Sequence, residues 1–350
     1  APVTYTVTAE DIANGYATID GLTPETPYKA VLKLDNRTRG TIEFTTSIDT
    51  GGMTLVAEGD DLVAAIEADK GEGLFLTGST YELGDYTLSK AIAIAAAPAN
   101  KPIIHGRFIV NSDITSFTLT NLIFDGQNEL DNVLQMSGAT ANLSTLTFEN
   151  CEIRNMKKHL IYNGVGATIG DIVINNCIWD NIEGNGGDGF DFREGDKLGS
   201  LIVTNTTFSN GVRTFLRCQA ELSGNISFTN CTFYNICTFN NSNNHGLFRI
   251  TNGANSTFTV HNCIFYGIGF TGASGNMGVW ARTGSNMAGT ESYANNYWFN
   301  SPNLWGALHA SDHESVATEA DPGFADAANG DFTISNEDMI YYQVGDPRWY

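Results

Sequence analysis

Short apolar runs recur along most of the chain, and their spacing predicts its secondary structure. Each run begins with Asn, continues with a small or thiol residue and a variable residue, and ends with an aromatic or aliphatic residue. The runs begin at Asn121, Asn150, Asn176, Asn205, Asn230, Asn262 and Asn296, in steps of 29, 26, 29, 25, 32 and 34 residues. A period of this length marks a solenoid, and short runs rich in β-branched and aromatic residues favour strands over helices.

Each repeat also holds two further apolar runs. One ends near Gly, as in 134–138, 160–164, 190–195, 216–219, 248–253 and 279–284. The other precedes the Asn, as in 172–174, 201–203 and 226–228. No helical period appears within a repeat. The pattern therefore predicts an all-β parallel β-helix with three strands per coil.

The run that ends near Gly predicts which side chains face outward. Because a strand alternates its faces, Phe190 and Phe192 should point into the core while Asp191 and Arg193 point outward. Alignment of the repeats by the terminal Gly gives one outward column of Gln135, Ile161, Asp191, Arg217, Arg249 and Trp280. The next outward column is Ser137, Asn163, Arg193, Gln219, Thr251 and Arg282.

The distribution of charge along the chain suggests a function for these outward columns. The net charge of −21 argues against nucleic acid and anionic membrane as partners of the whole surface, and no apolar run approaches the roughly 18 residues of a membrane span. Five of the ten arginines nevertheless fall in this one stretch of four repeats: Arg193, Arg213, Arg217, Arg249 and Arg282. Stacked like charges repel each other, whereas guanidinium groups match carboxylates and sulfates well.

We interpret this stretch as a surface that binds an acidic polysaccharide. Arg213, Arg249 and Arg282 would bind its acidic groups, and Trp280 would offer a plate on which a sugar ring stacks. An internal ladder is the alternative, in which Arg217 and Arg249 pair with acidic side chains of the same chain and bind nothing. Its acidic partners would be Asp191, Glu194 and Glu221.

The six cysteines support a stacked interior. Cys151, Cys177, Cys231 and Cys263 occupy the same position after the repeat Asn. Stacked strands lie about 4.8 Å apart with parallel side chains, a poor geometry for a disulfide. We therefore expect buried free thiols that act as small apolar side chains. No CxxC pair or Cys/His spacing favours a metal site.

The first 50 residues follow another pattern. The segment 22–28, Leu-Thr-Pro-Glu-Thr-Pro-Tyr, resembles the tyrosine corner of fibronectin III sandwiches, with strands expected at 28–34 and 41–46. We expect a partial fibronectin-III-like, β-sandwich-like segment at 1–50, or a small cap packed on the solenoid. A linker at 47–52 would lead to the β-helix at 53–350.

Residues 53–350 resemble the pectate-lyase-like β-helix superfamily. A short amphipathic helix at 61–68 would cap the solenoid, and first-coil strands are expected at 73–78 and 91–95. The resemblance implies a right-handed parallel β-helix. The closing segments 321–324, 330–334 and 345–349 look like those of surface proteins in Bacteroidetes glycan-utilisation systems. This likeness implies an extracellular protein, either secreted or held at the cell surface as an outer-membrane lipoprotein, whose signal is not present in this chain.

The stretch Asn185-Gly-Gly-Asp-Gly-Phe-Asp-Phe-Arg193, with Arg217 one coil later, resembles the site of β-helix lyases that act on alginate and dermatan-type chains. By this resemblance, Asn163, Asp188 and Asp191 would bind Ca²⁺. Arg193 would take the position of the catalytic base, which is a lysine in those lyases, and Arg217 that of the acid. Arginine holds its proton tightly and is a poor base. Lys157, Lys158 and His159, one coil earlier, are further base candidates.

The sequence thus predicts an extracellular, carbohydrate-active protein, expected to be monomeric. Its leading function is β-elimination on an acidic polysaccharide of the uronic-acid, pectin- or alginate-like kind, whether or not Ca²⁺ is used. The alternative is a cell-surface protein that binds the same glycan without turnover. A hydrolase would need clustered carboxylates, for which Asp188 and Asp191 offer one pair. A purely structural spacer or adhesin is also left open.

Overall fold

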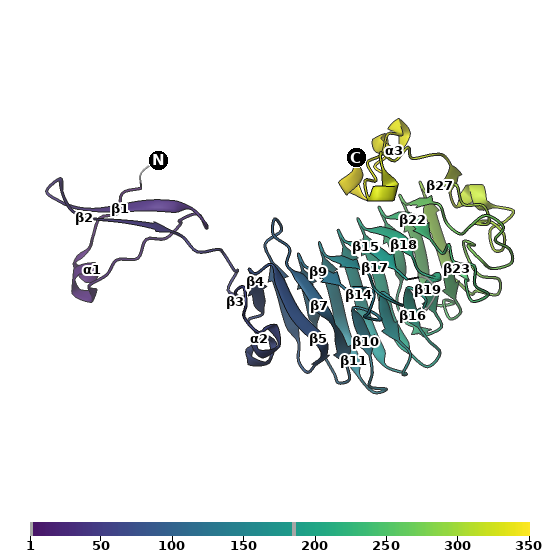
Figure 1. The fold of residues 1–350 in the computed structure, drawn as a ribbon, viewed down its shortest axis with the longest axis horizontal. Coiled ribbons are helices and arrows are strands. Elements are labelled where there is room, and N and C mark those ends of the chain that lie inside the picture. Colours follow the sequence, from purple (N-terminus) through teal and green to yellow (C-terminus); the bar gives the residue numbers. More distant parts are fainter. Residues whose placement is uncertain (1–2, 184–186) are drawn as a thin grey trace. The chain divides into compact units, whose positions relative to one another are not determined.

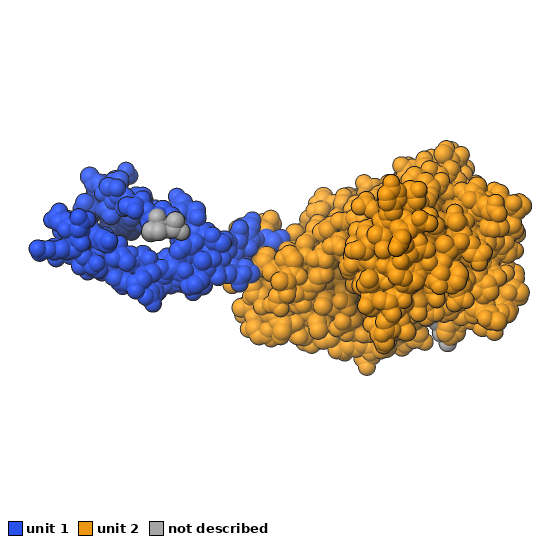
Figure 2. All heavy atoms as spheres, turned by 90° about the horizontal axis from the view of Figure 1, so that it is seen from above, with its two compact units in different colours: residues 1–53 blue, residues 54–350 orange. Residues whose placement is uncertain are grey.

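The computed structural model describes residues 3–183 and 187–350, and the chain divides into two compact units, residues 1–53 and 54–350 (Figure 2). The protein is mostly β, and its strands form long parallel sheets in the second unit. The all-β class and the parallel pairing predicted from the repeats are confirmed. No helix in the described residues is long and apolar enough to cross a membrane.

Unit 1 is a small antiparallel ribbon. Strand β1 (Pro27–Leu34) pairs with β2 (Arg37–Thr45), and helix α1 (Ala9–Asn14) precedes them with Thr8 as its N-cap. The Tyr28 hydroxyl accepts a hydrogen bond from the Thr23 amide at 2.8 Å, which fixes the start of β1. Apolar side chains of the ribbon, such as Leu32 and Ile42, are exposed. The likeness of this unit to fibronectin III stays a prediction.

Unit 2 opens with the expected short helix. Helix α2 (Leu62–Ala68) is capped by the Asp61 side chain, which accepts from the Ala64 amide, and it buries Leu62 and Ile66. The first strands of the unit precede and follow this helix along the chain: β3 (Thr54–Val56) before it, then β4 (Leu74–Leu76), β5 (Thr80–Leu88), β6 (Ile92–Ala96) and β7 (Ile103–Val110).

The later repeats each contribute strands to three parallel ladders. Ladder A is a separate sheet that continues β3, β4 and β6 with β8 (Phe117–Thr120), β11 (Asn142–Glu149), β14 (Thr168–Asn175), β17 (Lys197–Thr204), β20 (Glu221–Leu222), β21 (Ile226–Thr229), β24 (Thr257–His261) and β26 (Thr290–Ala294). Ladders B and C share one further sheet and meet at the long strand β7, which also pairs with β5.

Ladder B follows the repeat Asn and contains β9 (Ile123–Asp125), β12 (Glu152–Arg154), β15 (Ile178–Ile182), β18 (Thr207–Gly211), β22 (Thr232–Ile236), β25 (Ile264–Tyr266), β27 (Tyr297–Phe299) and β28 (Thr318–Glu319). Ladder C contains β10 (Leu134–Met136), β13 (Ile161–Asn163), β16 (Phe190–Phe192), β19 (Thr214–Cys218) and β23 (Gly246–Ile250). Figure 1 shows these strands following one another along the unit.

The repeat Asn makes the corner between ladders A and B. Asn150 and Asn176 have positive φ angles of 51° and 54°, a left-handed conformation that Asn tolerates better than other non-glycine residues. Their side chains form a ladder of hydrogen bonds, with 2.7 Å from Asn150 Nδ2 to Asn121 Oδ1. In the last repeat the left-handed residue is Asn295, whose amide donates to Asn262. Asn296 lies instead in the cysteine position, so the sequence alignment there was one residue late.

The interior is a stack of equivalent side chains from successive repeats. Phe208, Phe233 and Phe265 overlap with ring centroids 5.3 and 4.7 Å apart. All six cysteines are buried and free, which confirms the expectation of interior thiols. Because each stacked ring buries apolar surface on both faces, the continuous core supplies most of the driving force for folding.

The C-terminal segment folds back onto ladder B (Figure 1). After β28 it contains α3 (Glu337–Tyr341) and the short 3₁₀ helices at Ala327–Asn329 and Pro347–Trp349, and another 3₁₀ helix at His313–Ser315 precedes β28. Val344, Ile334 and Met339 form a small core with Ile264.

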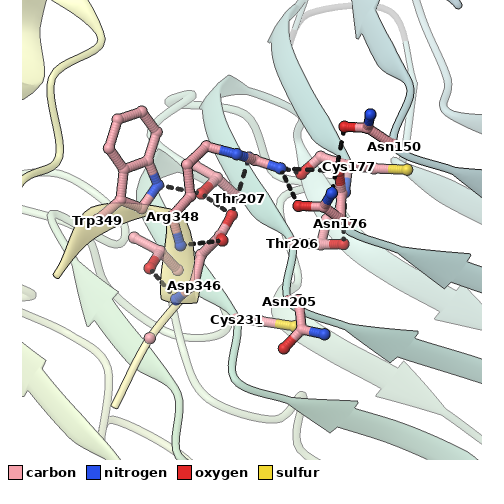
Figure 3. Close-up of polar contacts among 12 residues, drawn as sticks. Asn150, Asn176, Cys177, Asn205, Thr206, Thr207, Cys231, Asp346, Arg348 and Trp349 are labelled. Atoms are coloured by element: carbon pink, nitrogen blue, oxygen red, sulfur yellow. Dashed lines mark hydrogen bonds and ion pairs between the residues drawn. The ribbon is translucent and has the colours of Figure 1, made fainter. Parts of the chain in front are cut away.

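The closing sequence Gly345-Asp-Pro-Arg-Trp349 is a clasp on the Asn ladder (Figure 3). Arg348 donates to the carbonyl and the side-chain oxygen of Asn176, both at 2.7 Å, and pairs with the buried carboxylate of Asp346 at 3.0 Å. Asp346 also accepts from Thr207 Oγ1 at 2.8 Å. The Asn ladder is interrupted here, because Asn205 donates to Asn175 rather than to Asn176. The closing motif is therefore a structural fastener.

We predict that Arg348→Ala lowers the free energy of unfolding of unit 2 by about 3 kcal/mol, because it leaves the buried Asp346 carboxylate without its cation. Denaturant unfolding monitored by tryptophan fluorescence measures the loss. Arg37→Ala, at an exposed position of unit 1, is the control and should leave the transition of unit 2 unchanged. Equal stability of the two variants would show that the clasp does not hold the segment.

Candidate functional site

The outward column of ladder C carries the polar side chains that the sequence singled out. In the parallel pairing, Asp191 lies opposite Tyr162 on one side and Arg217 on the other, and Arg217 lies opposite Arg249. A bridge between Phe248 and Ala281 places Arg282 next along the column. With Arg193 and Arg213 beside it, this column brings together the five arginines that we call the arginine row.

Two buried aspartates pair with the first three arginines of the row, which leaves this cluster with one excess positive charge. Arg213 contacts the Asp188 carboxylate at 2.8 Å, and Arg193 contacts that of Asp191 at 3.1 Å. Arg217 lies between them, 3.7 Å from each carboxylate. Burial acts to lower the pKa of Arg193, but the hydrogen bond and charge of Asp191 raise it overall. Part of the row is thus an internal ion-pair cluster. The alternative interpretation expected Arg217 to pair with Asp191, and the structure adds Asp188 in place of Glu194 and Glu221.

The last two arginines of the row have no such partner. Among the residues that the structure describes, neither Arg249 nor Arg282 has a carboxylate within ion-pair distance, and the Nε atom of each is buried without a hydrogen-bond acceptor. Arg282 donates to the Thr283 carbonyl at 3.3 Å. Burial, together with the charges of Arg217 and Arg282, lowers the pKa of Arg249. An uncompensated cationic patch therefore stands on a strongly acidic protein.

The pKa of His245 is affected by the positive charges of this patch. This histidine immediately precedes β23, and its backbone amide donates to Thr214 Oγ1 at 2.9 Å. Burial, followed by the charges of Arg249 and Arg282, lowers the pKa of His245 to about 4. The imidazole is therefore neutral at neutral pH. Since the unfolded chain holds this proton more tightly, His245 lowers stability as the pH falls from about 6.5 towards about 4.

A cavity of about 290 Å³ opens where the column meets the preceding repeat. It is lined by Asp131, Asn132, Gln135, Lys158, His159, Tyr162 and Arg193. The rings of His159 and Tyr162 lie 4.8 Å apart at 30°, and the Arg193 guanidinium sits 5.1 Å from the centre of the Tyr162 ring. Lys158 is bound by Asp131 at 2.8 Å. The cavity thus combines a histidine, a phenol and a cation next to the arginine row.

Trp280 does not face outward as the alignment of the repeats predicted. It is fully buried, packs against Phe265 and Trp305 at 5.0 and 5.6 Å, and offers no plate for a sugar. In–out alternation fails at the corner where the chain enters ladder C, because two successive residues such as Phe215 and Leu216 both turn into the core. Arg282 therefore takes the place in the outward column that the alignment gave to Trp280.

Asn163 does not lie in the outward column, where the predicted calcium site requires it. It lies opposite Phe192 in the pairing, is fully buried, and donates its amide to the Ala167 carbonyl at 2.9 Å. The alignment by Gly had placed Ile161 rather than Tyr162 beside Asp191, a shift of one residue that reverses every face of the strand. The calcium ligands expected from the sequence therefore do not come together.

The carboxylates of Asp188 and Asp191 are both paired with guanidinium groups. Within 3–183 and 187–350, no cluster of three or more His, Cys, Asp or Glu side chains has the geometry to hold a metal ion. The two carboxylates at this site are thus arranged to bind arginine side chains. Asn185 and Gly186 of the lyase-like stretch lie outside the described residues.

Tyr162 and His245 are the site residues that sequence reasoning missed. Tyr162 carries a signal, because a partly buried phenol usually finds a polar neighbour for its hydroxyl, but the shifted register hid it. His159, which the sequence offered as a further base, lines the cavity, whereas Lys157 is exposed and does not.

We predict that Arg249→Gln raises the pKa of His245 from about 4 towards its ordinary value, because a positive neighbour is removed. An NMR pH titration of the histidine ring protons measures the change, with the His245 resonance assigned by loss of signal in His245→Gln. Arg37→Gln in unit 1 is the matched control. An unchanged titration would show that burial alone holds the pKa down.

Two parts of the chain are similar to protein families whose function is unknown. One family model, described as a domain of unknown function (DUF4957), matches residues 79–211. Another, described as a domain of unknown function (DUF5123), matches residues 226–349. No curated protein matches the chain. The first match includes Asp188, Asp191 and Arg193, and the second includes Arg249 and Arg282, so the candidate site spans parts of the chain similar to both families.

Proposed function

We propose that unit 2 is a right-handed parallel β-helix of the pectate-lyase-like kind. Three parallel ladders, interior stacks of equivalent side chains and a capping helix support this proposal. In such a fold the outward face of a ladder forms a long, straight surface. Sites repeated along that surface match the repeating units of an extended polymer.

We propose that the arginine row binds an acidic polysaccharide built of uronic acids. The observation that carries this proposal is the pair Arg249 and Arg282, whose guanidinium groups lack carboxylate partners among the described residues. Adjacent cations on paired strands repel each other, and an external carboxylate would remove this repulsion. A guanidinium binds a carboxylate through two parallel hydrogen bonds, which favours a uronate over a neutral sugar.

The same face supports a lyase-like reaction on the bound uronate. β-Elimination requires that the uronate carboxylate be neutralised. Beside the cavity three arginines face two aspartates, and the one excess positive charge would serve that purpose without Ca²⁺. A non-catalytic cell-surface protein that binds the same glycan is the second candidate. It is favoured by the position of Arg249 and Arg282, neither of which lines the cavity. In both cases the protein would act outside the cell, as a monomer secreted or held at the cell surface.

We predict that the double variant Arg249→Ala/Arg282→Ala binds a polyuronide at least tenfold more weakly than the unmodified protein, because each arginine contributes charged hydrogen bonds. Affinity gels and calorimetry with polygalacturonate and alginate measure the change. Measurements with and without Ca²⁺ test whether the ion takes part. The wild-type affinity should also fall as salt is added.

The matched control is Arg37→Ala/Arg39→Ala, which removes two exposed arginines from β2 in unit 1. It should bind as the unmodified protein does. If both double variants bind equally well, the arginine row is not the binding face.

A further inference from the structure

We infer that His159 and Tyr162 are the proton-transfer pair of a β-elimination on a uronate in the cavity, with His159 as the base and Tyr162 as the acid. This inference rests on the proposed binding of uronate by the arginine row. It replaces Arg193, which the sequence resemblance placed as the base, and gives Arg193 the task of holding the substrate carboxylate.

The position of His159 makes its Nε2 atom a base. Its Nδ1 atom lies 2.8 Å from the backbone carbonyl oxygen of Asp188, and a carbonyl only accepts, so Nδ1 carries the hydrogen. The neutral ring then has its lone pair on Nε2. No described residue hydrogen-bonds to Nε2, while the ring lines the cavity. The lone pair is therefore available to a substrate.

The surroundings keep His159 neutral. Burial lowers its pKa, and Arg193 acts in the same direction, although the Asp188 carbonyl and the charges of Asp191 and Asp188 oppose them. The Asp191 carboxylate lies 3.8 Å from Nδ1, but it already binds Arg193. A neutral imidazole can accept a proton near neutral pH, unlike an arginine.

Close packing holds the pair in position. A Cβ atom on Gly187 would lie 2.6 Å from His159 Cε1, so only glycine leaves room for the ring there. A Cβ atom on Gly164 would lie 2.5 Å from the Tyr162 hydroxyl. Tyr162 stands in the outward column directly beside Asp191, where Arg193 and Arg217 meet. A uronate whose carboxylate reaches these arginines would bring its ring over the pair.

The reaction balances without another reactant. His159 Nε2 takes the C5 proton of the uronate, and the C–H electron pair forms the C4–C5 double bond. The C4–O4 bond breaks, and the leaving oxygen receives the phenolic proton of Tyr162. Arg193 and Arg217 offset the charge that develops on the carboxylate. Proton exchange with water returns both side chains to their starting states.

The test measures binding and product formation separately on polygalacturonate, alginate and dermatan sulfate. Affinity gels report binding, and absorbance near 235 nm reports the unsaturated product. We expect the unmodified protein to form product, and His159→Gln and Tyr162→Phe to lose about 10²-fold or more of that rate while binding within about threefold of the unmodified protein. Circular dichroism and thermal unfolding verify that both variants are folded.

The matched controls are His105→Gln in β7 and Tyr234→Phe in β22, neither of which lines the cavity. Both should retain the full rate. Product formation that survives His159→Gln would overturn the assignment of the base. Binding without product on every polymer would also overturn this inference and leave the glycan-binding protein standing. Absence of both binding and product would contradict the proposed function itself.

Discussion

Backbone register between stacked repeats is the constraint on which the rest of the structure depends. Parallel strands about 4.8 Å apart place each residue beside its equivalent in the next repeat. The left-handed Asn corners keep that register through repeats of unequal length, because their side-chain amides bond to one another along the stack. As a result, phenylalanines stack on phenylalanines inside, and arginines stack on arginines outside.

The same register creates a favourable core and an unfavourable surface column. Stacked apolar rings gain from contact, whereas Arg217 beside Arg249 brings like charges together. Asp188 and Asp191 relieve the repulsion at one end of the row. At the other end, the described part of the chain provides no carboxylate for Arg249 and Arg282. The site is therefore asymmetric, with an ion-paired cluster next to a cavity and a cationic patch without carboxylate partners beyond it.

The C-terminal clasp shows what the chain does when an arginine has a structural task. Arg348 pairs with the buried carboxylate of Asp346. It also donates hydrogen bonds to the backbone and side-chain oxygens of Asn176, more than 170 residues away in sequence. Its acceptors are thus all internal. Arg249 and Arg282, in contrast, have no carboxylate partner among the described residues. This difference within one molecule supports our proposal that their partners come from outside.

The sequence by itself determined the parallel β architecture, the repeat, the buried free cysteines and the gathering of five arginines in one stretch of four repeats. These features follow from local composition and period. Only the tertiary structure decided which residues face each other. A one-residue shift in register exchanged Ile161 for Tyr162, and a corner in the chain turned Trp280 into the core. Loop lengths between strands vary, so pairing across about 30 residues depends on how whole repeats stack, and no local pattern records it.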